Sequence, residues 1–113
     1  MDLKTLTIKK SDNRIIVNIT EKRIYLGITD IFREEMISVV ENTYDEMIIN
    51  LENVAVMNSA GLGVLIMARD KIKKINGRIK LTNLQPLMQD IFSRMRLDTL
   101  FEIYANVEEA CDK

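Results

Sequence analysis

The chain has 113 residues, of which 47% are hydrophobic and 29% charged, and its formal net charge is −1. This length and composition predict one compact domain over residues 1–113, and the near-neutral charge provides no global basic field that would favour nucleic acid. No window reaches the roughly 18 apolar residues of a membrane span. Neither direct nucleic-acid binding nor a membrane span is therefore predicted.

Histidine is absent from the sequence, which removes the commonest general base and the commonest metal ligand. This excludes Ser-His-Asp triads, Cys-His dyads and zinc sites built on histidine. Cys111 is the single cysteine, so an internal disulfide cannot form, as suits a reducing cytoplasm. The single cysteine therefore predicts a cytoplasmic protein, and the missing histidines count against an enzyme; no cofactor or metal is predicted.

The N-terminal part of the chain has the pattern of two paired strands. Leu3–Lys10 alternates apolar and polar residues, and Arg14–Ile19 is rich in β-branched residues. Turn-forming residues separate them, so an antiparallel hairpin is predicted. The stretch Glu21–Ile28 fits either an extension of the second strand or a loop.

A helix and a buried strand are predicted next. Thr29–Thr43 has apolar residues at helical spacing and begins with Thr29 and Asp30, which are both favourable N-cap types. Met47–Leu51 is almost continuously apolar, as is typical of a strand covered on both faces. Residues Glu52–Met57 are predicted to connect this strand to the following helix.

The second predicted helix begins at Ser59 and ends at Asn76-Gly77, a strong C-cap pair. Its first half is apolar nearly all round, and its second half is amphipathic. The remaining predicted elements are a strand at Arg78–Leu84, a helix at Gln85–Met95 with Pro86 in its first turn, a strand at Leu100–Ala105 and a short helix at Asn106–Lys113 with an asparagine cap.

The predicted order is β-β-α-β-α-β-α-β-α, which indicates an α/β fold. Strands that alternate with helices pair in parallel through right-handed crossovers. The sheet is therefore predicted to be mixed and mostly parallel, with the N-terminal hairpin as its antiparallel element. The stretch "MNSAGLGVL", Met57–Leu65, falls near the carboxyl end of a strand, where open α/β sheets place functional crevices.

This stretch allows two interpretations of Ser59. As an N-cap, its oxygen would accept from a free N–H of the first turn, and its loss would cost about 0.5–2 kcal/mol of stability. Gly61 and Gly63 favour a functional interpretation, because each costs about 0.8–1 kcal/mol in a helix and leaves room for a close approach. A phosphate on Ser59 would lie at a helix N-terminus, which tolerates anions.

A nucleotide-binding loop is not predicted at this stretch. "GLG" is only part of the dinucleotide fingerprint, and a third glycine is missing at the required spacing. A G-x-x-x-x-G-K-[ST] motif is also absent.

The segment "LENVAVMNSAGLGVLIMARDKIKKINGRIKLTNL" resembles the central part of STAS domains, the fold shared by sulfate-transporter tails and bacterial anti-sigma factor antagonists. The ending "PLMQDIFSRMRLDTLFEIYANVEEA" is similar to that of the family as well. The family pattern here is an apolar strand, Asp-Ser-Ser/Thr-Gly-Leu-Gly, a helix, a glycine and a strand.

The resemblance implies that this chain is an antagonist whose Ser59 is phosphorylated by its partner, a serine-kinase anti-sigma factor. The unphosphorylated form binds that kinase and frees the sigma factor; a serine phosphatase resets the phosphorylated form. The residues implied in partner binding are Asn58, Ser59, Ala60, Gly61, Leu62 and Gly63.

The chain departs from the family pattern at three places. Asn58 replaces the usual aspartate before the serine, and Ala60 leaves one hydroxyl in the motif. Near the first helix the family often has Gly-x-Leu-Asp, and "TEKRIYLGITD" lacks that acid at the matching place, with Asp30 left as a helix cap.

Two alternatives remain open. In the first, the chain is an unphosphorylated STAS subunit of a lipid-transport complex or a sensory scaffold, with Ser59 serving only as a cap. In the second, it is an enzyme or a phospho-accepting receiver domain, which would need clustered acids at the strand ends. Glu52 lies just beyond one strand, but no acidic partner for it is apparent on the N-terminal strands.

Overall fold

The computed structural model describes residues 3–42 and 45–113. Its secondary-structure elements, in chain order, are β1 (Leu6–Ser11), β2 (Arg14–Ile19), β3 (Arg23–Ile24), α1 (Gly27–Glu41), β4 (Glu46–Asn50), β5 (Val56–Met57), α2 (Ser59–Lys74), β6 (Arg78–Thr82), α3 (Pro86–Arg94), the 3-10 helix η1 (Leu97–Thr99), β7 (Glu102–Tyr104) and α4 (Val107–Asp112).

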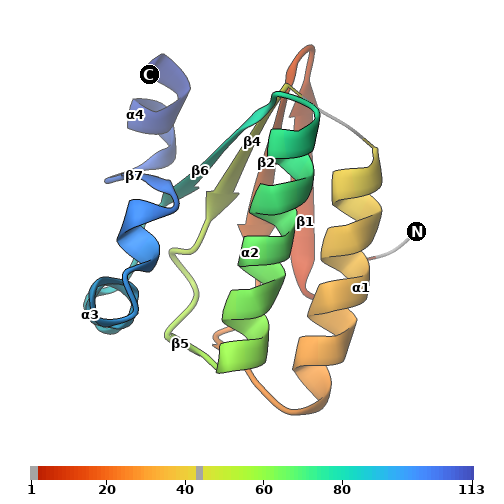
Figure 1. Cartoon of the computed structure of the whole chain (residues 1–113). Helices are drawn as coiled ribbons and strands as arrows, with labels where there is room; N and C mark the ends of the chain where they lie inside the picture. The colour runs from red at the N-terminus through yellow and green to blue at the C-terminus, as the bar shows by residue number, and fades with distance from the viewer. Residues whose placement is uncertain (1–2, 43–44) are drawn as a thin grey trace.

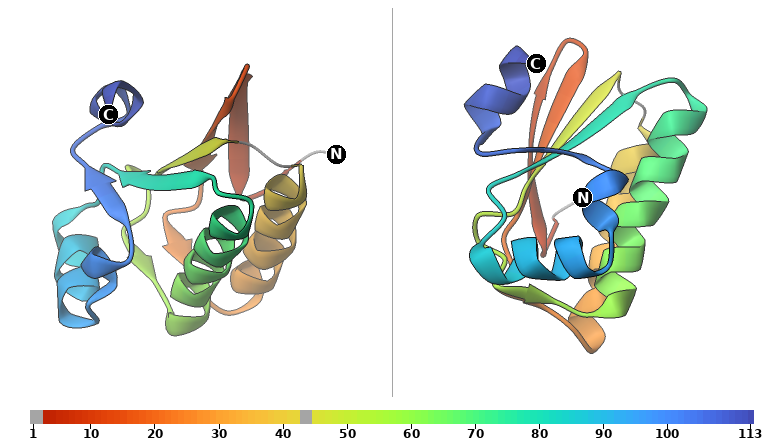
Figure 2. Two further views of the ribbon diagram at one scale, coloured as in Figure 1. Left: turned by 45° about the horizontal axis from the view of Figure 1, so that its top comes forward. Right: turned by 60° about the vertical axis from the view of Figure 1, so that its left-hand side comes forward.

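Within these described ranges, five strands form a mixed sheet in the order β1-β2-β4-β6-β7. The β1–β2 hairpin is antiparallel, and the other neighbours pair in parallel. Helices α1 and α2 lie side by side on one face of the sheet, and α4 lies on the other (Figures 1 and 2). The predicted mixed, mostly parallel sheet with an N-terminal hairpin is therefore confirmed.

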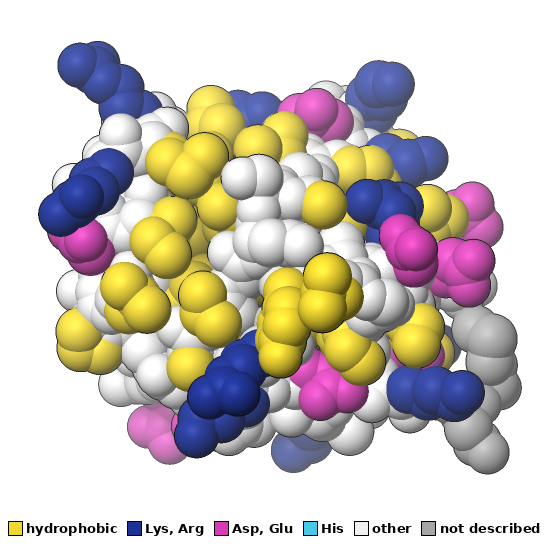
Figure 3. All heavy atoms as spheres, turned by 90° about the horizontal axis from the view of Figure 1, so that it is seen from below, with side chains coloured by type: hydrophobic (Ala, Val, Ile, Leu, Met, Phe, Trp, Pro, Cys, Tyr) yellow, Lys and Arg dark blue, Asp and Glu magenta, His cyan; other side chains and the backbone are white. Residues whose placement is uncertain are grey.

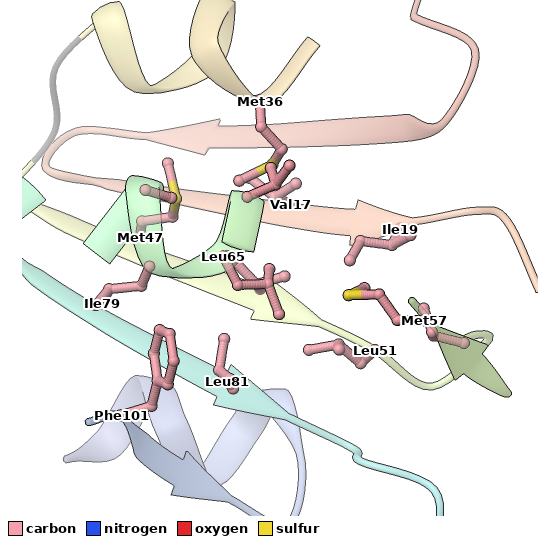
Figure 4. Packing of buried hydrophobic residues seen from close by; sticks show 14 of the residues in the cluster. Val17, Ile19, Met36, Met47, Leu51, Met57, Leu65, Ile79, Leu81 and Phe101 are labelled. Atoms are coloured by element: carbon pink, nitrogen blue, oxygen red, sulfur yellow. The ribbon is translucent and has the colours of Figure 1, made fainter. Parts of the chain in front are cut away.

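The main hydrophobic core lies between the sheet and the α1–α2 layer. Alternate strand residues such as Val17, Ile49 and Leu81 share one register row and face the helices. Met36 of α1 and Leu65 of α2 meet them from the helical side (Figure 4). These five side chains are almost completely shielded from solvent, so this core fixes how α1 and α2 lie on the sheet.

The opposite face of the sheet carries a buried ion pair. The Lys80 ammonium is fully buried and lies 2.8 Å from Oε2 of Glu46, and it donates to the Ala110 carbonyl of α4 at 2.6 Å. Arg14 donates to the other oxygen of Glu46 and to the carbonyl of Cys111. Burial favours the neutral acid, but these two cations outweigh it and hold the pKa of Glu46 below its usual value.

The ends of α2 and α4 carry caps that the sequence predicts. After Lys74, Ile75 and Asn76 close the helix, with Asn76 at φ 62° and the Gly77 N–H donating to the Ile72 carbonyl at 2.9 Å. This is a Schellman arrangement, with asparagine rather than glycine in the left-handed position. The Asn106 side chain accepts from the Glu109 N–H at 2.8 Å at the start of α4.

Several elements differ from the sequence-based expectations. The short strands β3 and β5 pair with each other in parallel and occupy stretches predicted as an undecided segment and a connector. The 3-10 helix η1 was not predicted. Helix α1 begins at Gly27 rather than at Thr29, and its predicted end at Thr43 lies outside the described residues.

Candidate functional site

The β3–β5 pair brings the starts of α1 and α2 together at one end of the molecule (Figure 1). The Ala55 N–H donates to the Lys22 carbonyl at 2.7 Å, and the Asn58 N–H donates to the Ile24 carbonyl at 2.9 Å. Because β3 leads into α1 and β5 leads into α2, these bonds fix the two helix starts relative to each other. The motif residues 58–63 occupy the turn from β5 into α2 and its first turns.

Asn58, rather than Ser59, is the N-cap of α2. Its backbone is extended, at φ −76° and ψ 174°, and its Oδ1 accepts from the Gly61 N–H at 2.8 Å. The hydroxyl of Thr29, on α1, donates to the same Oδ1 at 3.4 Å. The interpretation of Ser59 as the cap is therefore wrong, because the adjacent asparagine already occupies that position.

Ser59 is the first residue of α2 and is exposed to solvent. Its hydroxyl makes no hydrogen bond with any residue in the described part of the chain. The Ser59 and Ala60 N–H groups belong to the first helical turn, which has no acceptor within the helix. The first turn of α2 also carries no acidic residue. The hydroxyl is thus accessible and lies beside free N–H donors.

Glycine occupies positions 61 and 63 for different structural reasons. A Cβ on Gly61 would lie 2.5 Å from Cγ of Met57 and 2.9 Å from Cγ2 of Ile24, so glycine is required where α2 passes over the β3–β5 pair. A Cβ on Gly63 would meet no atom of the described residues within 4 Å. Gly61 is therefore needed for internal packing, whereas Gly63 faces open space.

The structure divides the six predicted binding residues by exposure. Ser59, Ala60 and Gly63 are exposed, and Asn58 is half-buried. Gly61 and Leu62 are buried and support the turn from inside. Binding of a partner by these six residues stays a prediction at this point.

The start of α1 differs from its prediction in a way that affects this site. Its N-cap position is Leu26, whose side chain cannot cap and which is 78% exposed at φ 51° and ψ −135°, a backbone conformation that favours glycine. Asp30 does not cap the helix, and its carboxylate instead pairs with Arg33 at 3.0 Å. The Thr29–Asn58 contact was not foreseen, because no sequence pattern relates positions 29 residues apart.

The surface at this end carries apolar side chains, and most of the charged side chains lie toward its edges (Figure 3). Tyr25 is 43% exposed and precedes Leu26 at the start of α1, and Leu87 of α3 is 53% exposed. Exposed apolar side chains therefore occur at the start of α1 and in the first turn of α3.

A receiver-type acidic site is not formed by the described strands. The ends of β2 and β4 carry amides, with Nδ2 of Asn50 donating to Oδ1 of Asn18 at 2.9 Å. Across residues 3–42 and 45–113, no group of three or more acidic, cysteine or histidine side chains could hold a metal ion. Within the same residues, no helix is long and apolar enough to cross a membrane.

Comparisons with known proteins agree with this architecture. The model of the STAS domain family matches residues 5–110. The anti-sigma-B factor antagonist of Bacillus subtilis (strain 168) is 32% identical over 102 residues, which cover 89% of this chain and 91% of that protein.

Solved structures share the fold at lower identity. An anti-sigma factor antagonist from Mycobacterium paratuberculosis superposes with a TM-score of 0.84 at 20% identity, covering 96% of this chain and 91% of that one. The Bacillus cell-fate determinant SpoIIAA in its phosphorylated form superposes with a TM-score of 0.71 at 19% identity, covering 95% and 96%.

The structure is a small α/β domain in which the starts of α1 and α2 lie together and α2 begins with an exposed serine. The family match over residues 5–110 and the curated relative identify it further: the chain belongs to the STAS domain family.

Proposed function

We propose that this protein is an anti-sigma factor antagonist that is switched by phosphorylation of Ser59. In the unphosphorylated form it binds an anti-sigma factor, which is a serine kinase, and so releases the sigma factor. The observation that supports this most directly is the exposed Ser59 hydroxyl, which has no partner among the described residues and lies at the N-terminus of a 16-residue helix. The relationship to the Bacillus subtilis anti-sigma-B factor antagonist favours the same function.

The start of α2 suits a phosphoserine on physical grounds. A phosphate carries about −1.5 to −2 charges at neutral pH. The free N–H groups of Ser59 and Ala60 and the helix dipole favour an anion there without any refolding. Asn58 caps the helix without adding a negative charge, so the phosphate does not face a carboxylate from the preceding residue.

The same phosphate weakens binding of a partner that covers Ser59. A charge buried against an interface loses its hydration, and acidic groups on the partner repel it. A penalty of about 3 kcal/mol lowers affinity more than a hundredfold, since 1.4 kcal/mol corresponds to tenfold. In this scheme Ser59, Ala60 and Gly63 contact the partner, while Asn58, Gly61 and Leu62 hold the turn in place.

The remaining components follow from this scheme. The anti-sigma factor supplies the phosphoryl group from ATP, and a serine phosphatase removes it. The protein itself is a regulatory binding protein in the cytoplasm and not an enzyme. It acts on transcription through its partner and does not contact nucleic acid directly.

A capture experiment with three baits tests this function. Wild type, Ser59→Ala and Ser59→Asp are coupled to resin and exposed to extract from the host, and the bound proteins and the wild-type Ser59 peptide are identified by mass spectrometry. We expect an anti-sigma factor kinase on the first two baits, its loss from Ser59→Asp, and phosphate on wild-type Ser59. If all three baits retain the same transporter or scaffold proteins and Ser59 is unmodified, the protein is a constitutive STAS subunit.

A further inference from the structure

An open groove runs between α1 and α2 next to the phosphorylation site proposed above. It has a volume of about 320 Å³, and its lining residues are Arg33, Ile37, Ala60, Gly63, Val64 and Met67. Arg33 and Ile37 come from α1, and the other four come from the first half of α2. Ala60 is the residue after Ser59, so the groove begins in the same turn of α2 as the proposed phosphorylation site.

Gly63 keeps this groove open, and the fold of this chain does not require it. A Cβ added there would meet no atom of residues 3–42 and 45–113 within 4 Å, whereas a Cβ on Gly61 would clash with Met57 and Ile24. Glycine inside a helix is destabilising relative to alanine. A glycine that is costly and has no internal neighbour is explained when the space above it belongs to another molecule.

The lining of the groove indicates the chemistry of its occupant. Ile37, Val64 and Met67 form an apolar floor, on which Ile37 and Met67 are half-buried. Among residues 3–42 and 45–113, Arg33 is the one charged residue that lines the groove, and no carboxylate does. Its guanidinium pairs with Asp30, but this pair is exposed, and exposed pairs are weak enough to be replaced by a better-placed acid.

We propose that this groove seats an apolar side chain of the anti-sigma factor, next to an acidic residue of that partner that pairs with Arg33. This inference rests on the proposed function and names the surface and the chemistry through which it operates. Methionine on the floor suits such a contact because its flexible side chain adapts to the shape of the occupant.

The arrangement also explains how phosphorylation releases the partner. The groove and the proposed phosphorylation site share the first turns of α2, because Ala60 and Gly63 line the groove and Ser59 precedes them. A phosphate on Ser59 adds negative charge to this part of the surface and so repels an acidic partner surface that covers it. Release by this route needs no change in the fold of this chain.

Calorimetric titration with the purified anti-sigma factor kinase tests the inference. The variants are Gly63→Leu, which fills the groove, Arg33→Glu, which reverses its charge, and Lys73→Leu, a matched control that adds the same side chain at the far end of α2. We expect Gly63→Leu and Arg33→Glu to bind at least tenfold more weakly and Lys73→Leu to bind as wild type does. Circular dichroism and thermal melting establish that the variants are folded.

Carbon-13 labelling of the methionine methyl groups reports on the groove itself. On addition of the kinase, the Met67 signal should shift, while that of Met95, an exposed residue beyond α3, should not.

Each contrary result has a distinct meaning. If wild type binds the kinase and Gly63→Leu binds it equally well, the groove does not bind a side chain of the kinase. The inference then fails, and the proposed function stands. If wild type does not bind the kinase at all, the proposed function fails and the inference fails with it. A Met67 signal that shifts with the concentration of this protein alone would assign the groove to a second copy and overturn the inference.

Discussion

At the scale of single residues, the Asn58 side chain links the starts of α1 and α2. Its Oδ1 accepts from the Gly61 N–H in the first turn of α2 and from the Thr29 hydroxyl of α1. The neighbouring Ser59 makes neither contact and points to solvent. Stability and switching are therefore assigned to adjacent residues, which allows each to be tested without changing the other.

Replacing the two residues by alanine should separate these roles. Asn58→Ala removes the N-cap and should lower the free energy of unfolding by about 0.5–2 kcal/mol. Ser59→Ala removes an exposed hydroxyl and should change it by less than about 0.5 kcal/mol. Urea denaturation of both variants checks this. A larger loss for Ser59→Ala than for Asn58→Ala would contradict the assignment of the cap.

The two motif glycines should respond to alanine with opposite signs. Gly63→Ala adds a Cβ in open space and should stabilise the protein by about 0.8–1 kcal/mol, the helix-propensity difference. Gly61→Ala forces a Cβ against Met57 and Ile24 and should destabilise it by about 1–3 kcal/mol. Thermal melting compares the pair under one buffer. Equal effects of the two substitutions would show that Gly63 is not in open space.

At the scale of elements, α4 is held on the sheet by cations that bind its last carbonyls. Lys80 donates to Ala110, Arg14 donates to Cys111, and Arg78 donates to Lys113. Carbonyls at the end of a helix have no partner inside it, so these strand residues satisfy them and place positive charge at the negative end of the dipole. The helix therefore depends on the sheet beneath it more than on its own length of six residues.

Removing the Lys80 ammonium should release this helix. Lys80→Ala leaves the Glu46 carboxylate with Arg14 alone in a largely buried position, and breaking such a pair costs about 3–5 kcal/mol. We expect a lower urea midpoint and faster amide hydrogen exchange in α4 than in α2. Lys73→Ala, at an exposed lysine, is the control. Unchanged exchange in α4 would mean that Lys80 does not hold it.

Some of the helices and strands can be predicted from the sequence alone, and others cannot. The hairpin, α2 and α4 have clear periodicity or caps, and each was predicted at close to its observed position. Strands β3 and β5 have two residues each, which is too short for any period to be recognised. The N-cap type of Thr29 predicts that α1 begins there, but the helix begins two residues earlier, at Gly27, directly after the turn that follows β3.

At the site, the serine and its motif can be recognised from the sequence. Which motif residue caps the helix and which is exposed cannot. Asn58 and Ser59 are both favourable caps, and propensity does not decide between neighbours. The groove between α1 and α2 depends on how two helices lie together, which no local pattern specifies.

At the scale of the whole molecule, buried carboxylates join distant parts of the chain. Glu35 of α1 accepts from the Lys4 and Thr5 N–H groups at 2.7 and 2.8 Å and so fixes the segment before β1. Burial favours the neutral acid, but the hydrogen bonds from Thr5 and Lys4 outweigh it and lower the pKa of Glu35. Burial also favours the neutral form of Glu46, but Lys80 and Arg14 outweigh it and lower its pKa.

These lowered pKa values predict acid sensitivity. A carboxylate whose pKa is lower in the folded state stabilises the fold above its unfolded pKa of about 4.3, and this stability is lost as the pH falls through the folded value. The free energy of unfolding should therefore be nearly constant around neutrality and decrease below about pH 5. Urea denaturation over a pH series measures this, and Glu35→Gln should flatten the dependence. Stability that rises on acidification would contradict it.

The central claim is that Ser59 accepts a phosphoryl group from the anti-sigma factor that this protein binds. The most direct measurement is to incubate the protein with that purified kinase and ATP, map the phosphate by mass spectrometry, and titrate the modified protein back onto the kinase. We predict one phosphate on Ser59, none on Ser59→Ala, and affinity at least a hundredfold weaker after modification, about 3 kcal/mol. Modification at another residue, or equal affinity before and after, would contradict the switch.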